Sequence, residues 1–180
     1  TGFCATYYQA PLGEVMLSAL PAGLKRLDPP TPRIPKVAKA LPQPSPMPEL
    51  TGEQTAVIDA VRAAGAGFKP FLLFGVTGSG KTEVYLRLIA DALDKGGQVL
   101  LLVPEINLTP QLEARVAARF PAAGLVSLHS ELTEAARLRN WLAAADGRAR
   151  IVLGTRLAVF TPLPDLALII VDEEHDASFK

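Results

Sequence analysis

One eight-residue stretch, Gly75-Val76-Thr77-Gly78-Ser79-Gly80-Lys81-Thr82, constrains the fold more than any other part of the sequence. It has the pattern G-x-x-x-x-G-K-T and stands between an apolar run, residues 71–74, and a segment with helical periodicity. Glycines let the backbone curl so that successive N–H groups point at one place, and a helix beginning there adds the positive end of its dipole. The pattern predicts a phosphate-binding loop between a strand and a helix. We call residues 75–82 the glycine-rich loop.

The chemistry of this loop predicts a nucleoside triphosphate with Mg²⁺. Lys81 can reach the β and γ phosphates of ATP, and the hydroxyl of Thr82 can hold Mg²⁺. The alternative is a glycine-rich turn between strand and helix that binds nothing. The correct flanking segments favour the phosphate site.

A second motif closes the sequence, where the apolar run 166–171 is followed by Asp172 and Glu173. Ligands collect at the carboxyl ends of parallel strands, so these carboxylates are expected beside the glycine-rich loop. Asp172 would hold Mg²⁺ through water, and Glu173 would orient and deprotonate the attacking water. An acidic turn after a buried strand is the alternative.

Apolar runs alternating with helical patterns predict an α/β fold, a parallel sheet with helices on both faces. We expect helices over residues 12–20, 51–64, 82–93, 110–120 and 133–145, and strands over residues 71–74, 98–103, 125–128, 151–153 and 166–171. Ten of the 16 prolines fall in residues 1–50. They predict a short first segment (1–27), a proline-rich linker (28–49) and one nucleotide-binding unit (50–180).

Composition narrows the possible partners. The chain has 18 basic and 18 acidic residues and a net charge of zero, so any contact with nucleic acid must be local. The densest basic stretch, residues 137–156, is more typical of a solvated surface. The sequence has a single cysteine, no zinc-site spacing and no secretory leader, and its apolar runs are short. These features together predict a cytoplasmic protein that does not enter a membrane.

Several motifs resemble a known family. Asp172-Glu173-Glu174-His175 is similar to the D-E-x-H box of superfamily 2 helicases. Four stretches resemble the primosomal protein N′ family, the PriA-type DNA helicases of replication restart. They are GVTGSGKTEVYL (75–86), LVPEINLTPQ (102–111), GRARIVLGTRLAVFTP (147–162) and LIIVDEEHDASFK (168–180). ATYYQAPLGEVMLSALP (5–21) and LHSELTEAARLRNW (128–141) also resemble the family.

The resemblance implies a 3′-to-5′ DNA helicase that acts at stalled forks and in primosome assembly, with single-stranded DNA-binding protein among its partners. Its two RecA-like lobes would hold ATP between them. Only the first lobe matches this sequence, so the resemblance implies a fragment that does not unwind DNA alone. The second lobe and a cysteine-rich zinc insert would lie beyond residue 180. The rival reading is a regulatory nucleotide-binding module that switches a partner without moving along DNA.

The resemblance also assigns smaller roles. It implies DNA-backbone contacts for Thr109, Gln111, Thr155 and Arg156, and coupling between the nucleotide and DNA sites for His175. Gln54 occupies the place of an adenine-reading glutamine, although Thr51-Gly52-Glu53-Gln54 also predicts a capping box. Two departures from the family stand out. Leu157 replaces its usual serine, and the distance from Pro21 to Gly75 is short for an intact winged-helix domain.

Overall fold

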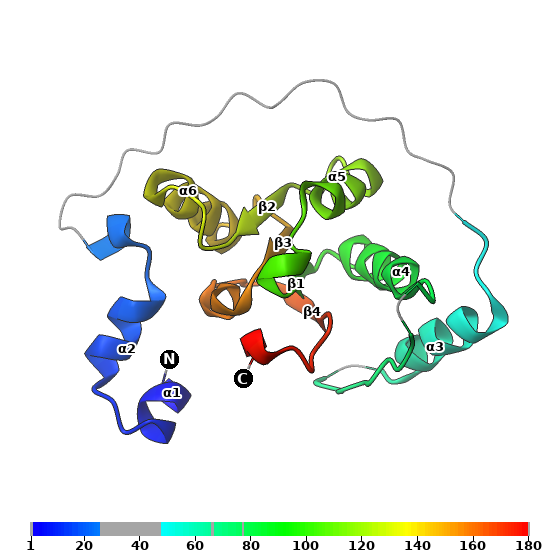
Figure 1. The fold of residues 1–180 in the computed structure, drawn as a ribbon, viewed down its shortest axis with the longest axis horizontal. Coiled ribbons are helices and arrows are strands. Elements are labelled where there is room, and N and C mark those ends of the chain that lie inside the picture. Colours follow the sequence, from blue (N-terminus) through cyan, green and yellow to red (C-terminus); the bar gives the residue numbers. More distant parts are fainter. Residues whose placement is uncertain (1, 26–47, 66, 77, 180) are drawn as a thin grey trace.

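The structure is a computed structural model that describes residues 2–25, 48–65, 67–76 and 78–179. Its helices and strands alternate through the second half of the chain (Figure 1). The α-helices are α1 (Gly2–Tyr7), α2 (Leu12–Ala19), α3 (Gly52–Ala63), α4 (Lys81–Asp94), α5 (Pro110–Arg119) and α6 (Glu134–Ala145). The strands are β1 (Gln98–Leu102), β2 (Leu125–Leu128), β3 (Ile151–Gly154) and β4 (Leu166–Val171). Short 3₁₀ helices are η1 (Ala22–Lys25), η2 (Glu105–Asn107), η3 (Arg156–Phe160) and η4 (Ala177–Phe179).

The four strands form one parallel sheet in the order β2-β3-β1-β4. Leu100 of β1 is paired with Val152 of β3 on one side and with Ile169 of β4 on the other. Every residue of β1 and β3 is buried, as expected of inner strands covered on both faces. Because all four strands run the same way, the loops that follow them lie along one edge of the sheet. The predicted α/β class is confirmed.

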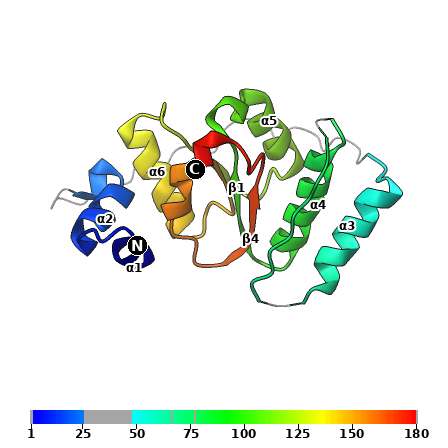
Figure 2. The same ribbon diagram turned by 60° about the horizontal axis from the view of Figure 1, so that its bottom comes forward.

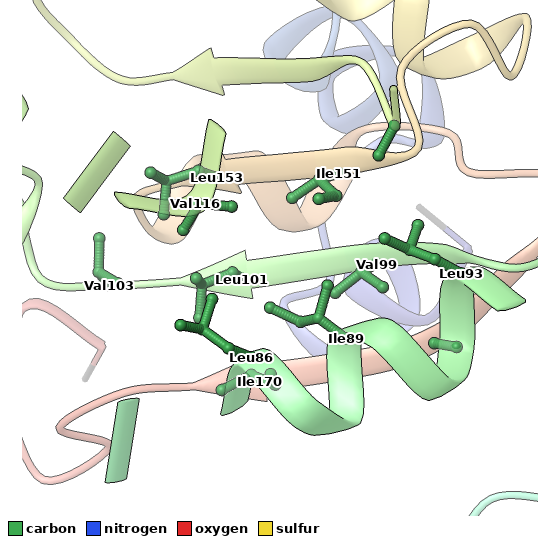
Figure 3. Packing of buried hydrophobic residues seen from close by; sticks show 12 residues of the cluster. Leu86, Ile89, Leu93, Val99, Leu101, Val103, Val116, Ile151, Leu153 and Ile170 are labelled. Atoms are coloured by element: carbon green, nitrogen blue, oxygen red, sulfur yellow. The ribbon is translucent and has the colours of Figure 1, made fainter. Parts of the chain in front are cut away.

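Helices α4 and α5 cover one face of the sheet, and α6 with η3 covers the other (Figure 1). Figure 3 shows the first interface, in which the apolar side of α4 faces the strands. Fully burying one such side chain stabilises the fold by about 1.5–3 kcal/mol. The main residues here are Leu86, Ile89, Leu93, Val99, Leu101, Val116, Ile151, Leu153 and Ile170. The second interface contains Leu100, Leu102, Leu128, Ala144, Val152 and Ala158.

Helix α3 begins at the predicted capping box and lies against α4 (Figure 2). The Thr51 hydroxyl accepts a hydrogen bond from the Gln54 backbone, and the Gln54 side chain accepts one from the Thr51 backbone. The guanidinium of Arg62 donates two hydrogen bonds, of 2.7 and 2.9 Å, to the carboxylate of Asp91. These two hydrogen bonds join α3 to α4, the helix that follows the glycine-rich loop.

The amino-terminal segment packs beside α6, on the opposite side of the sheet from α3 (Figure 2). The Ala22 backbone donates to Glu134 Oε2 at 3.3 Å, and Gly23 lies so close to Leu138 that a Cβ would come within 2.5 Å of its side chain. The sequence predicted α2 but not α1. Most of the predicted linker, residues 28–47, lies outside the described residues.

One predicted element was wrong. Residues 71–74 were expected to form a strand, yet residues 68–76 have no regular secondary structure and take no place in the described sheet. Phe71, Leu72 and Phe74 are 53, 77 and 92% exposed. The physical reason is that apolar composition favours burial but does not supply an adjacent strand. A strand requires a hydrogen-bonded partner, and in the described sheet β4 is paired only with β1.

Candidate functional site

The glycine-rich loop leads directly into α4. Gly78 and Gly80 both have a φ of +83°, a left-handed conformation that residues with a Cβ rarely adopt. Gly80 is the N-cap of α4, and no side chain caps this helix. The first backbone N–H groups of a helix have no partner within it, so an uncapped N-terminus suits an anion. Val76 is exposed, and Thr77 lies outside the described residues.

Lys81 joins this loop to the turn after β4. Its Nζ donates a hydrogen bond of 2.7 Å to the carbonyl oxygen of Gly75 and lies 3.5 Å from Glu173 Oε1. The Lys81 side chain is 18% exposed and that of Glu173 28%. Glu173 has a φ of +50°, which costs a residue with a Cβ about 1–2 kcal/mol. The structure therefore brings together the two motifs that the sequence placed at one site.

Asp172 is the other carboxylate of this turn, and α4 holds it as well. The Tyr85 hydroxyl donates a hydrogen bond of 3.0 Å to Asp172 Oδ1, and the Asp172 backbone donates to the carbonyl oxygen of Leu102. Burial raises the pKa of Tyr85 above its ordinary range, and the nearby negative charges of Asp172 and Glu173 raise it further. Thr82 lies half-buried in the first turn of α4, three residues before Tyr85.

A buried ion-pair network supports the same helix. The Glu83 carboxylate lies 3.0 Å from the guanidinium of Arg87 and 3.1 Å from that of Arg119 at the end of α5. The side chain of Glu83 is only 8% exposed, so removing one partner would leave a poorly compensated buried charge. Neither this network nor the role of Tyr85 was predicted. The four-residue spacing of Lys81 and Tyr85 places them on one helix face, but it does not name their partners.

Gln54 has two sets of contacts. Besides forming the capping box, its Nε2 donates to the carbonyl oxygen of Ser79 at 3.3 Å. Nε2 also lies only 2.5 Å from the position that a Cβ on Gly80 would take. The capping box is confirmed, and the glutamine lies against the glycine-rich loop.

The predicted DNA-contact residues follow β1 and β3, along the same edge of the sheet as Asp172. The Thr109 hydroxyl accepts a hydrogen bond from the Leu112 backbone and caps α5, while Gln111 is exposed. Thr155 is buried at the end of β3, and Arg156 is exposed. His175 is 74% exposed, and its two nitrogens lie 3.6 Å from Glu173 Oε2 and 3.4 Å from Glu174 Oε2.

Thr155 also lines a cavity of about 100 Å³ between the amino-terminal segment and the sheet. Leu20, His129 and Trp141 contribute to its wall. The Trp141 Nε1 is buried without a hydrogen-bond partner in the described part of the chain. Neither Lys81 nor Glu173 lines this cavity.

Three arginines of residues 137–156 have partners within the fold. Arg137 pairs with Glu134 at 3.2 Å and Arg148 with Asp146 at 2.6 Å. Arg150 instead donates to the backbone carbonyl of Gly97 at 3.0 Å. The first two contacts are ion pairs between neighbouring surface residues, as expected of a solvated face.

Comparison with known proteins decides the family. Residues 51–180 match the DEAD/DEAH box helicase family. The chain belongs to this family. The match covers all four strands, so the α/β fold is that of the RecA-like lobe of these helicases.

The chain is also similar to replication restart proteins called PriA. It is 53% identical to the PriA of Synechocystis over 133 residues, which are 74% of this chain and 16% of that protein. It is 53% identical to the Haemophilus influenzae protein over 115 residues, 64% of this chain and 16% of that protein. It is 35% identical to the Rickettsia felis protein over 176 residues, 98% of this chain and 26% of that protein. These similarities confirm the resemblance to PriA-type helicases, and the chain spans about a sixth to a quarter of these relatives.

Membership of the DEAD/DEAH box helicases implies the use of ATP and Mg²⁺. The residues fit this pair, because the loop offers an uncapped helix N-terminus and a lysine while the facing turn offers two carboxylates. Among the described residues, no group of three or more His, Cys, Asp or Glu could hold a metal by itself. A Mg²⁺ here would therefore need ligands from the nucleotide and water. Within the part of the chain that the structure describes, no helix is long and apolar enough to span a membrane.

Proposed function

We propose that residues 50–180 are the ATP-binding and ATP-hydrolysing lobe of a 3′-to-5′ DNA helicase that acts in replication restart at stalled forks and in primosome assembly. The observation that carries the proposal is the position of Lys81. Its ammonium group lies between the Gly75 carbonyl and the Glu173 carboxylate, 3.5 Å from the latter. A phosphate-binding lysine is thereby placed beside the acid that ATP hydrolysis requires.

The glycine-rich loop and the turn after β4 divide the chemistry between them. Backbone N–H groups of residues 75–82 and the Lys81 ammonium bind the phosphates of ATP. Thr82 and Asp172 would hold a Mg²⁺ ion, which would neutralise part of the phosphate charge. Glu173 orients the attacking water and accepts its proton. The general base is Glu173 rather than Glu174, because the Glu173 carboxylate is the one that faces Lys81.

Contacts with DNA come from the loops along the same edge of the sheet. Thr109, Gln111, Thr155 and Arg156 contact the DNA backbone in this proposal, and their position after β1 and β3 supports it. His175 couples the two sites, because it lies beside Glu173 while its side chain is open to solvent. Gln54 reads adenine in a nucleotide-bound state and keeps the capping box in the state described here.

The remaining assignments rest on the PriA relatives, which are named as replication restart proteins. We infer that forked DNA, primosome proteins and single-stranded DNA-binding protein are the partners of the complete protein. We also propose a cytoplasmic location and a zinc site elsewhere in the complete protein.

The experiment is a steady-state ATPase assay on the complete protein, with and without forked DNA that carries a single-stranded arm. We expect turnover to rise at least about tenfold with DNA, and unwinding to require ATP. Lys81→Ala should abolish both activities, while Lys95→Ala, at the far end of α4, should keep them. Normal ATP turnover that is insensitive to DNA, without unwinding, would instead show a regulatory switch module.

A further inference from the structure

The helix that follows the glycine-rich loop contacts both acidic residues of the turn after β4. Lys81 and Tyr85 are four residues apart, so they occupy one face of α4. Lys81 faces Glu173 at 3.5 Å, and the Tyr85 hydroxyl donates to Asp172 Oδ1 at 3.0 Å. Two successive carboxylates are thus each held by a different side chain of one helical turn.

The geometry points to Tyr85 as a positioning residue that fixes the Asp172 carboxylate for the Mg²⁺ of bound nucleotide. This inference rests on the proposed function. The hydroxyl takes one carboxylate oxygen, Oδ1, and leaves the other, Oδ2, for the metal ion or its water. Partners that orient a metal-binding carboxylate commonly contribute about 10–100-fold to metal affinity.

Both ends of this hydrogen bond are firmly held. The ring of Tyr85 packs against the buried cluster beneath α4, so the hydroxyl is carried on an anchored side chain. On the other side, the Asp172 backbone donates to the Leu102 carbonyl of β1 at 2.9 Å. Because both groups are held in place, the hydrogen bond between them fixes the orientation of the Asp172 carboxylate.

The position of Tyr85 within the helix strengthens the assignment. Thr82, the other proposed metal-holding residue, lies three residues earlier on the same helix. Residues three apart are neighbours on a helix surface. The hydroxyl of Tyr85 therefore sets the carboxylate of Asp172 relative to the helix turn that carries Thr82, which gives the hydroxyl a role beyond packing.

Tyr85→Phe tests the inference, because it removes one oxygen and keeps the ring that packs in the core. Affinity for a fluorescent ATP analogue is measured in excess EDTA and across a Mg²⁺ titration, using the complete protein. Tyr8→Phe is the matched control, since it removes the phenolic hydroxyl of a residue that is 72% exposed and lies outside the site. A thermal melt of each variant establishes that it is folded.

We expect Tyr85→Phe to need about tenfold more Mg²⁺ to reach half of the Mg²⁺-dependent increase in affinity for the analogue. Its affinity in EDTA should stay within about twofold of the parent, and Tyr8→Phe should match the parent throughout. In an Asp172→Asn background, adding Tyr85→Phe should produce no further shift, because the hydroxyl acts through Asp172.

Three results would overturn the inference. The Mg²⁺ titration of Tyr85→Phe could coincide with that of the parent. The affinity of the variant for the analogue could fall by the same factor in EDTA as in Mg²⁺, which would show a purely structural role. The shift could also persist in the Asp172→Asn background. Failure of the proposed function has a different signature, in which the parent and Lys81→Ala bind the analogue equally or not at all.

Discussion

Lys81 of α4 and Glu173 of the turn after β4 face each other, with Nζ 3.5 Å from Oε1. The contact joins the glycine-rich loop to the acidic turn, although the two motifs are far apart in the sequence. Lys81 also donates to the Gly75 carbonyl, so its ammonium is held where the loop curls. The site is therefore already assembled in the described chain, with each group placed by a different element of the α/β fold.

Replacing Lys81 by alanine should weaken ATP binding. The lysine supplies a charge-assisted contact, and losing a hydrogen bond to a charged group costs about 1.5–3 kcal/mol. Affinity should thus fall about 10–150-fold, as measured by calorimetry with Mg²⁺ present. Lys95→Ala, at the C-cap of the same helix, is the control. Equal affinity of Lys81→Ala and the parent would argue against phosphate binding by the loop.

Gly80→Ala should destabilise the protein more than Gly78→Ala. Both glycines have a φ of +83°, so both substitutions incur the left-handed penalty of about 1–2 kcal/mol. Only at Gly80 would the new Cβ meet a neighbour, Gln54 Nε2, at 2.5 Å. Urea unfolding measures the difference. A Gly78 variant as unstable as the Gly80 variant would show that Gln54 does not press on the loop.

The ion pair between Arg62 and Asp91 should give stability a specific acid dependence. The hydrogen bond from Arg62 lowers the pKa of Asp91 in the folded state, whereas the unfolded value is about 3.9. A lowered folded pKa stabilises the fold above the unfolded value, and this contribution is lost as pH falls through the folded value. The stability difference between the parent and Asp91→Asn should therefore shrink from pH 6 to pH 3. A constant difference in urea unfolding over that range would contradict the assignment.

Gln98 should be among the most sensitive polar positions in the fold. The residue is 1% exposed, and its side-chain amide donates to the carbonyl oxygens of Ala144 and Ala149 and accepts from the Asp165 backbone. The Ala144 carbonyl also accepts from the Gly147 backbone, so Gln98→Ala would mainly leave the carbonyl of buried Ala149 without this donor. A buried group left unsatisfied costs about 1–3 kcal/mol, and the lost side chain adds to that cost. We expect a loss of at least about 2 kcal/mol in urea unfolding, with Gln111→Ala within about 0.5 kcal/mol of the parent. Equal stability of the two variants would show that water replaces the Gln98 amide.

Local pattern predicted most of the fold, since the strands at 98–102, 125–128, 151–154 and 166–171 lie where apolar runs were expected. The failure at residues 71–74 has a physical cause. An apolar run records a tendency toward burial, whereas a strand also needs a partner that no local sequence specifies. Helix starts were easier to predict, because Thr51 and Thr109 cap α3 and α5 through hydrogen bonds within the same few residues.

The candidate site, too, could be predicted from the sequence only in part. The glycine-rich loop and the Asp172-Glu173 pair were predicted to lie together because parallel strands end along one edge of a sheet, although only the acidic pair follows a strand of the described sheet. Tyr85 and the Glu83–Arg119 pair could not, since their partners depend on how α4 packs against β4 and α5. Contacts between elements follow from tertiary packing, and none of these three residues belongs to the loop motif itself.

The most direct test of the central claim compares Glu173→Gln with Glu174→Gln in the complete protein. Glutamine keeps the size of Glu173 but not its basicity, so ATP affinity should stay within a few-fold of the parent. Turnover should fall about 10²–10⁴-fold, the usual contribution of a positioned general base. Glu174, which faces His175 rather than Lys81, should tolerate the same change with turnover near that of the parent. Normal hydrolysis by Glu173→Gln, together with its loss in Glu174→Gln, would contradict the account.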